Sequence, residues 1–146
     1  MKILIFGLPG SGKTTLAKEL AYHFCVPHHN ADFYRTLHND WDFSERGRWR
    51  QLERMVQQKG ILDFIAPRQD MRDIVKADFT IWMDTIKESK YEDTNQLFEV
   101  PHYLDIDYRV EKWIDINQLH KCLADFSPGT TDILNFLKLH FRKLLK

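Results

Sequence analysis

The sequence contains little cysteine and no long run of apolar residues. Its two cysteines, Cys25 and Cys122, lie far apart and match no metal-binding spacing, so we expect thiols in a reducing cytosol. No segment approaches the roughly 18 apolar residues that a membrane span needs, and no apolar stretch of signal-peptide length follows Met1-Lys2. These absences favour a cytoplasmic protein with no membrane partner.

Net charge is missing as well. The 21 Lys and Arg residues balance 21 Asp and Glu residues, so no overall field draws the chain to nucleic acid or to an anionic membrane. This balance argues against a polynucleotide substrate without excluding one. The chain is instead rich in hydrophobic residues (43%) and aromatic residues (13%), and its 146 residues suffice for one domain but not for two. We expect a single domain over residues 1–146, with the oligomeric state open between a monomer and a homodimer.

The apolar pattern alternates between short runs and helical periodicity. Strands are predicted over residues 2–6, 26–30, 61–66, 79–83 and 108–116. Helices are predicted over residues 13–24, 44–59, 68–76 and 117–126, with a last one from 131 or 132 onward. Residues 33–43 are expected to be irregular, and residues 86–100 to form a loop with or without a short helix. This order predicts an α/β fold with a five-stranded parallel sheet and helices on both faces. Ligands of such sheets bind beyond the carboxyl ends of the strands.

One motif follows the first predicted strand directly. Eight residues fill the pattern G-x-x-x-x-G-K-[ST]: Gly7, Leu8, Pro9, Gly10, Ser11, Gly12, Lys13 and Thr14. Glycines let the backbone wrap around phosphate oxygens, and the N–H groups of the loop and of the next helix point at the anion. Lys13 would reach the β- and γ-phosphates, and the Thr14 hydroxyl would bind Mg²⁺. The loop, with Thr15 after it, predicts binding of ATP and Mg²⁺.

Two acidic residues follow predicted strands near this loop. Asp32 could accept a proton from a substrate hydroxyl or hold a Mg²⁺-bound water, and Arg35, three residues on, could grip an anion with its planar guanidinium. Alternatively, Asp32 caps a helix and Arg35 lies on the surface. Asp63 lies among apolar residues, where it could contact Mg²⁺ or bond to nearby backbone. The neighbouring His28 and His29 fit no zinc-binding spacing.

Four arginines gather near the start of the helix predicted over residues 44–59. Cations at a helix N-terminus oppose the helix dipole, and a bound anion would relieve that conflict. Arg48 and Gln51 are three residues apart and share a face. The cluster therefore indicates an anion site, with a solvated basic surface as the alternative. Its members are Arg46, Arg48, Arg50 and Arg54.

Taken in order from about residue 2 to residue 101, these motifs resemble those of the adenylylsulfate (APS) kinases. The phosphate loop, continuing into Leu16-Ala17, is similar to the family's G-x-S-G-S-G-K-S-T-L-A. Asn30-Ala31-Asp32-x-x-Arg35 is similar to D-G-D-x-x-R, and Phe43-Ser44-x-x-x-Arg48 to F-S-x-x-D-R. Ala66-Pro67 followed by Arg72 resembles S-P-x-x-x-x-R. Asn30, Gly47 and Ala66 each replace the family's usual residue.

The resemblance implies a P-loop kinase that transfers the γ-phosphate of ATP to the 3′-hydroxyl of APS. It implies catalytic roles for Lys13, Asp32 and Arg35, and Mg²⁺ contacts from Thr14 and Asp63. It implies acceptor contacts from Asp32, Phe33, Arg35, Phe43, Arg48, Gln51, Ala66, Pro67, Arg72 and Phe98. The lid-like segment, about residues 86–101, is shorter than the family's lid, which recognises the second substrate. A nucleoside or polynucleotide acceptor therefore stays open, as does a nucleotide-binding regulator with no acceptor.

Overall fold

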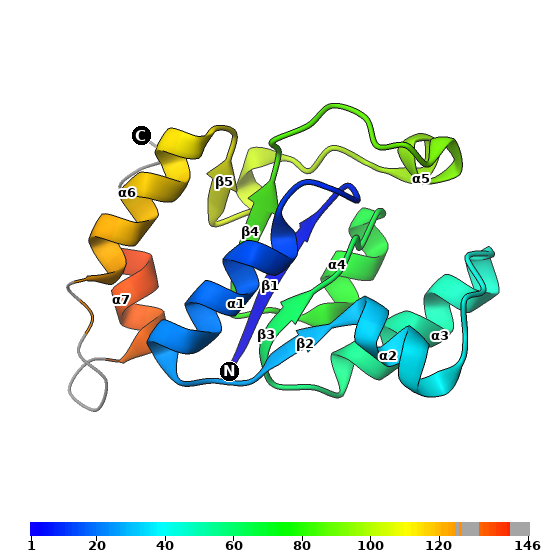
Figure 1. Cartoon of the computed structure of the whole chain (residues 1–146), viewed down its shortest axis with the longest axis horizontal. Coiled ribbons are helices and arrows are strands. Elements are labelled where there is room, and N and C mark those ends of the chain that lie inside the picture. The colour runs from blue at the N-terminus through cyan, green and yellow to red at the C-terminus, as the bar shows by residue number, and fades with distance from the viewer. Residues whose placement is uncertain (125, 127–131, 141–146) are drawn as a thin grey trace.

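A five-stranded parallel sheet forms the centre of the computed structural model, which describes residues 1–124, 126 and 132–140 (Figure 1). The strands run in the order β2-β3-β1-β4-β5. Their bounds are β1 (Lys2–Gly7), β2 (His28–Asn30), β3 (Gly60–Asp63), β4 (Phe79–Met83) and β5 (Tyr108–Val110). The predicted fold class is confirmed. The strand that leads into the phosphate loop is therefore the central one, with a partner on each side.

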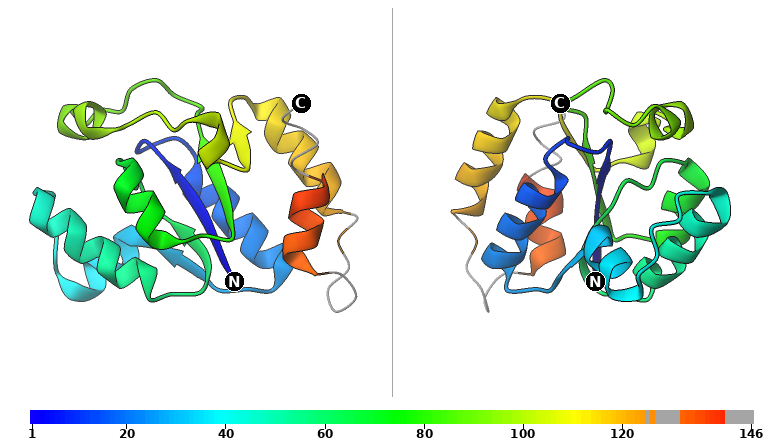
Figure 2. Two further views of the ribbon diagram at one scale, coloured as in Figure 1. Left: turned by 180° about the vertical axis from the view of Figure 1, so that it is seen from behind. Right: turned by 45° about the vertical axis from the view of Figure 1, so that its right-hand side comes forward.

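Helices cover both faces of this sheet, as the two turned views in Figure 2 show. One face carries α1 (Lys13–Phe24), α6 (Trp113–Leu123) and α7 (Ile133–His140), and the other carries α2 (Ala31–His38), α3 (Glu45–Val56) and α4 (Gln69–Val75). The lid-like segment contains α5 (Glu92–Leu97), and a 3₁₀ turn, η1 (Tyr103–Asp105), follows it. No helix among the described residues has the length and apolar character needed to cross a membrane.

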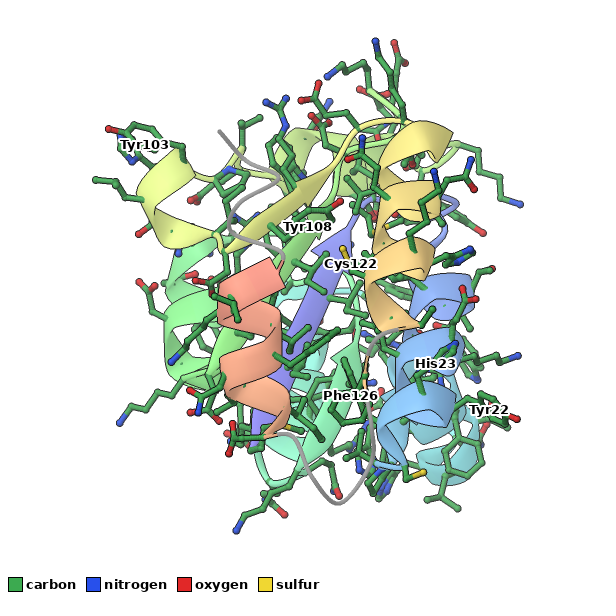
Figure 3. All side chains as sticks on the ribbon, turned by 90° about the vertical axis from the view of Figure 1, so that its left-hand side faces the viewer. Tyr22, His23, Tyr103, Tyr108, Cys122 and Phe126 are labelled. Carbon is green, nitrogen blue, oxygen red and sulfur yellow. The ribbon has the colours of Figure 1, made fainter. Side chains whose placement is uncertain are left out.

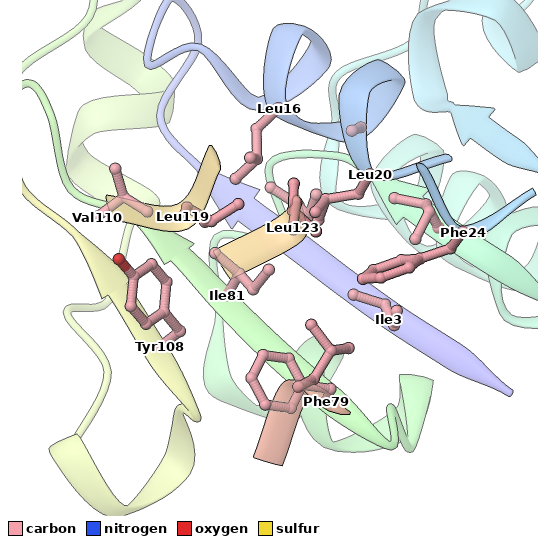
Figure 4. Packing of buried hydrophobic residues seen from close by; sticks show 14 of the residues in the cluster. Ile3, Leu16, Leu20, Phe24, Phe79, Ile81, Tyr108, Val110, Leu119 and Leu123 are labelled. Carbon is pink, nitrogen blue, oxygen red and sulfur yellow. The ribbon is translucent and has the colours of Figure 1, made fainter. Parts of the chain in front are cut away.

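Two separate cores pack against the sheet because successive residues of a strand point to opposite faces. From β1, Ile3 and Ile5 join the core under α1, α6 and α7, where Leu20 and Leu119 are fully buried (Figure 4). Residues of the same strand that alternate with these belong to the other core, with the apolar side chains of α3 and α4. By contrast, Tyr22 is 83% exposed and lies on the outer side of α1 (Figure 3). Both faces of the sheet are therefore sealed, which leaves its edge for a ligand.

Several predicted bounds were wrong. Residues 33–43 were expected to be irregular, but α2 occupies 31–38 because the Asn30 side chain caps it, accepting from the Phe33 N–H at 3.1 Å. The third and fifth strands are shorter than predicted. β5 is an edge strand that pairs with only three residues of β4, so α6 begins at Trp113. The predicted start of the last helix at residue 131, and its end over 141–146, lie outside the described residues.

Candidate active site

A cavity of about 940 Å³ lies beyond the carboxyl ends of the strands. Its walls come from the phosphate loop, the β2–α2 junction, the segment between α2 and α3 (the 39–44 loop), α3, the β3–α4 connection and the lid-like segment. In Figure 1 the lid-like segment, with α5, passes above this edge of the sheet. Predicted site residues that line it are Pro9, Gly10, Gly12, Lys13, Thr14, Thr15, Asp32, Arg35, Phe43, Arg48, Gln51, Asp63, Ala66 and Pro67. The structure thus brings most of the predicted residues to one space.

The phosphate loop presents polar atoms that have no partner within the protein. Gly12 begins α1 with φ 96°, and no side chain caps that helix end, so its N–H groups are available to an anion. The Ser11 hydroxyl is buried and makes no hydrogen bond. Gly7 is required by space, because a Cβ there would lie 2.6 Å from the Met83 carbonyl oxygen. A buried, unsatisfied hydroxyl and an uncapped helix end both fit a phosphate group.

Lys13 lies within this loop with its side chain folded back over the backbone. Its ammonium donates to the Leu8 carbonyl oxygen at 2.9 Å, and the residue is 8% exposed. Burial lowers the pKa of Lys13, while the nearby carboxylates of Asp63 and Asp32 act in the opposite direction. A cation so poorly hydrated gains more from a phosphate than a solvated one would.

Asp63 forms a small polar network at the end of β3. Its carboxylate accepts from the Asn30 amide at 2.9 Å and contacts the His28 ring nitrogen at 3.0 Å, and the same Asn30 amide donates to the Thr14 hydroxyl at 3.1 Å. Burial acts to raise the pKa of Asp63, but hydrogen bonds from His28, Asn30 and Thr14 outweigh it and hold the pKa below its usual range. Asp63 is therefore a carboxylate, linked to Thr14 by side chains.

This network fits a magnesium ion that accompanies a triphosphate. Thr14 and Asp63 would hold the ion, directly or through water, and the ion would neutralise charge on the phosphates. Among residues 1–124, 126 and 132–140, no three His, Cys, Asp or Glu side chains gather in a metal-binding group. Mg²⁺ in kinases takes one or two protein ligands and keeps several waters. The sequence analysis gave no role to His28 or Asn30, although β2 pairs with β3 so that Asn30 lies beside Asp63.

At the other end of the cavity, the 39–44 loop occupies Arg35. The Arg35 guanidinium donates to the carbonyl oxygens of Asp40 and Asp42 at 3.0 and 3.1 Å, and lies 4.2 Å from the centre of the Phe43 ring. Burial lowers the pKa of Arg35, partly opposed by Asp40. Asp32 is exposed on the first turn of α2, at the cavity wall. Arg35 therefore supports the wall that it also lines.

Arg48 joins α3 to the lid-like segment. It donates from Nε to the Phe43 carbonyl at 2.9 Å and from a terminal nitrogen to the Thr94 hydroxyl at 3.1 Å, with the Asp93 carboxylate at 3.5 Å. It is 7% exposed, and burial lowers its pKa while Asp93 opposes the shift. Gln51 donates to the Ala31 carbonyl at 2.7 Å. The arginine most buried in α3 thus faces both the cavity and α5.

The arginine cluster is not a single anion site as the sequence analysis suggested. Arg50 and Arg54 bind the Asp40 carboxylate, and Arg50 also binds Asp42. Neither of these two arginines lines the cavity. Their charges are matched within the protein, which leaves Arg48 as the cluster's cavity-lining member.

Three residues assigned to the acceptor do not line the cavity: Phe33, Arg72 and Phe98. Arg72 is buried and donates to the carbonyl oxygens of Ala66, Pro67 and Glu99 at 2.7, 2.9 and 2.6 Å. Its guanidinium lies 5.0 Å from the centre of the Phe98 ring, and burial lowers the pKa of Arg72 to about 10. These residues join the β3–α4 connection to the end of the lid-like segment.

Two aromatic residues that the sequence analysis did not assign do line the cavity. Trp41 of the 39–44 loop is 50% exposed, and Tyr91 of the lid-like segment is 48% exposed. Lys90 lies beside Tyr91, with its ammonium 5.4 Å from the ring centre. Aromatic residues near arginines in an irregular segment are the sequence signal that could have marked Trp41.

Solved structures of three kinases resemble this arrangement. A sugar kinase from Janibacter sp. HTCC2649 gives a TM-score of 0.66 at 14% identity, over 90% of this chain and 98% of the other. An APS kinase from Mycobacterium tuberculosis, in complex with AMPPNP and APS, gives 0.63 at 18% identity, over 86% and 97%. Shikimate kinase from Acinetobacter baumannii, in complex with shikimate, gives 0.56 at 15% identity, over 82% and 92%. The chain has the fold of the P-loop kinases.

No protein-family model matches the sequence, and a comparison with the sequences of curated proteins gives no match either. Identities of 14 to 18% to these P-loop kinases establish the fold alone. The three kinases differ in acceptor, so activity and acceptor must be argued from this chain's own side chains.

Proposed function

We propose that the protein is an ATP-dependent kinase that phosphorylates a hydroxyl group of a small anionic acceptor. The observation that carries this proposal is the shared cavity, in which the phosphate loop and Asp63 face Asp32, Arg35 and Arg48. A protein that only senses a nucleotide needs no buried arginines opposite its phosphate loop. A phosphotransferase needs them, because it holds two anionic substrates in one space.

In this proposal the chain's own residues act mainly by position and charge. Asp32 accepts the proton of the acceptor hydroxyl, whose oxygen bonds to the γ-phosphorus as the bond to the leaving ADP oxygen breaks. Lys13 and the loop amides stabilise the charge on the transferring group. Arg48 binds the acceptor's anion, and the lid-like segment that it contacts keeps water out.

For the acceptor we propose APS, with transfer to its 3′-hydroxyl. The ordered motifs support this choice, as does the pairing of a buried arginine with flat apolar rings at the same end of the cavity. Arg48 suits a phosphosulfate, and Trp41 and Tyr91 suit a nucleobase. The same two exposed rings favour a nucleoside or the end of a polynucleotide as the second candidate.

The test is ADP release with ATP and Mg²⁺ against a panel of acceptors. The panel contains APS, common nucleosides and nucleotides, short oligonucleotides, shikimate and gluconate, and mass spectrometry locates the added phosphate. We expect turnover that depends on APS and yields the 3′-phosphorylated product. Turnover with another acceptor alone would retain the kinase and reject APS. ATP binding without turnover on any acceptor would instead favour a nucleotide-binding regulator.

A further inference from the structure

Asp40, in the 39–44 loop, receives more charged hydrogen bonds than any side chain that lines the cavity needs to make. Its carboxylate accepts from Arg50 at 3.1 and 3.2 Å and from Arg54 at 2.7 Å, and its side chain is 12% exposed. The hydrogen bonds from Arg50 and then Arg54 hold the pKa of Asp40 well below its usual range. Bidentate arginine contacts of this kind fix orientation as well as distance. The carboxylate therefore stays charged and ties the loop to α3.

The same loop is held from its backbone by arginines that line the cavity. Arg35 of α2 donates to the carbonyls of residues 40 and 42, and Arg48 of α3 donates to the carbonyl of Phe43. The loop also runs so close to α3 that a Cβ at Gly47 would lie 2.1 Å from the Asp42 carbonyl oxygen. Five hydrogen-bonding side chains from two helices and the loop itself thus converge on six residues.

The side chains that this arrangement presents to the cavity are Trp41 and Phe43. Asp40 itself does not line the cavity, so any effect that it has on an acceptor passes through its neighbours. If the loop moved, the two rings would move with it, and Arg35 and Arg48 would lose the carbonyls that orient their guanidinium groups. A displacement of about 1 Å in such a wall is enough to weaken substrate positioning strongly.

We infer that Asp40 is a positioning residue for the acceptor half of the cavity, where it holds the ring wall and two arginines in their working arrangement. This inference rests on the proposed function, because it assigns Trp41, Phe43, Arg35 and Arg48 to acceptor binding. It adds a requirement that the proposed function does not contain: acceptor affinity depends on a carboxylate that touches no substrate.

The test compares Asp40→Asn with Glu45→Gln, which removes an acid of similar exposure to Asp42 from an ion pair with Arg68 on the same helix. Steady-state kinetics are measured for the acceptor that gives turnover in the panel and, separately, for ATP. We expect Asp40→Asn to raise the acceptor KM about tenfold, with the ATP KM changed less than about twofold. Asp40→Glu, which keeps the charge, should recover most of the lost affinity. Glu45→Gln should leave both constants unchanged.

Hydrogen exchange supplies a readout that needs no acceptor. In Asp40→Asn we expect faster exchange confined to the backbone amides of residues 39–44, where the Asp42 N–H donates to the Asp40 carboxylate at 3.3 Å. Unchanged exchange would overturn the inference, whether or not the enzyme acts on any acceptor. An unchanged acceptor KM would overturn it too. So would an equal rise in both KM values with a lower melting temperature, because that pattern reports general destabilisation.

If the wild-type protein turns over no acceptor, the proposed function fails by the panel alone. The exchange measurement still separates the two failures. Faster exchange limited to residues 39–44 would support Asp40 as the residue that holds this wall, while leaving the identity of the cavity's occupant to be sought elsewhere.

Discussion

At the nucleotide end of the cavity the backbone positions the functional atoms, whereas at the acceptor end side chains position other side chains. The phosphate loop offers N–H groups and one folded lysine, and its shape follows from glycines at fixed places. The acceptor wall depends on Asp40, Arg35 and Arg48, which come from different elements and hold one another. The first construction is local in sequence, and the second exists only when α2 and α3 are packed together.

This difference has a physical consequence for substitutions. A backbone cradle changes little when an outward side chain is replaced, but it loses its function when its one cation is removed. A wall of paired side chains is sensitive at each of its members, since each loss leaves a partner buried and unpaired. The following predictions separate the two constructions, beginning with the largest expected effect.

Lys13→Ala should give the largest loss, about 10³-fold in kcat/KM for ATP. The ammonium is the only side-chain charge that the loop contributes, and its burial removes the water that could replace it. Lys18→Ala removes an exposed lysine from the same helix and should have no effect. Similar kinetics for the two variants would show that the loop's backbone alone binds and activates the nucleotide.

Asp32→Asn should lower kcat about 100-fold while the ATP KM is retained. The amide keeps the size of the side chain but cannot accept the hydroxyl proton. The measurement is initial-rate kinetics in both substrates, with Asp73→Asn, an exposed acid on α4, as the control. Turnover at the wild-type rate would remove Asp32 from the mechanism and leave positioning as the whole of catalysis.

Arg48→Lys should raise the acceptor KM about tenfold, because an ammonium cannot replace the three directed contacts of the guanidinium. The exposed Arg46→Lys is the matched control on the same helix. If lysine served equally well at position 48, the acceptor end would be using charge alone, and the contrast between the two ends would disappear.

Thr85→Val should give the smallest effect, about a threefold rise in the ATP KM. The Thr85 hydroxyl donates to the Ser11 carbonyl oxygen at 2.6 Å and so joins the start of the lid-like segment to the phosphate loop. Valine keeps the shape and removes the hydrogen bond. Thr80→Val, on β4, is the control. A larger rise than that of Arg48→Lys would mean that the nucleotide end also depends on side-chain pairing.

The same contrast explains what the sequence could predict. The sheet and the phosphate loop were predictable because apolar runs and a fixed-spacing motif are local signals. The roles of Arg50 and Arg54 were not, since their partner Asp40 lies 10 and 14 residues earlier and meets them only after α2 and the loop fold back. Arg72 was assigned to the acceptor by its place in a motif.

In the structure, Arg72 instead holds the Glu99 carbonyl, 27 residues away, and only tertiary packing determines that contact. The missed helix α2 had a local signal, a capping asparagine at position 30. That signal was outweighed by the short, polar character of residues 33–43.

Gly47 lies where the resembling kinases carry an acidic side chain, and the close approach of the Asp42 carbonyl leaves no room for one. A chain that has any side chain at position 47 must therefore route the backbone near position 42 along another path. Over evolutionary time the two positions are constrained to change together, and a lineage that gains a side chain at one must rebuild the wall beside the other. The smallest residue of α3 thereby records which version of the acceptor wall a given descendant has inherited.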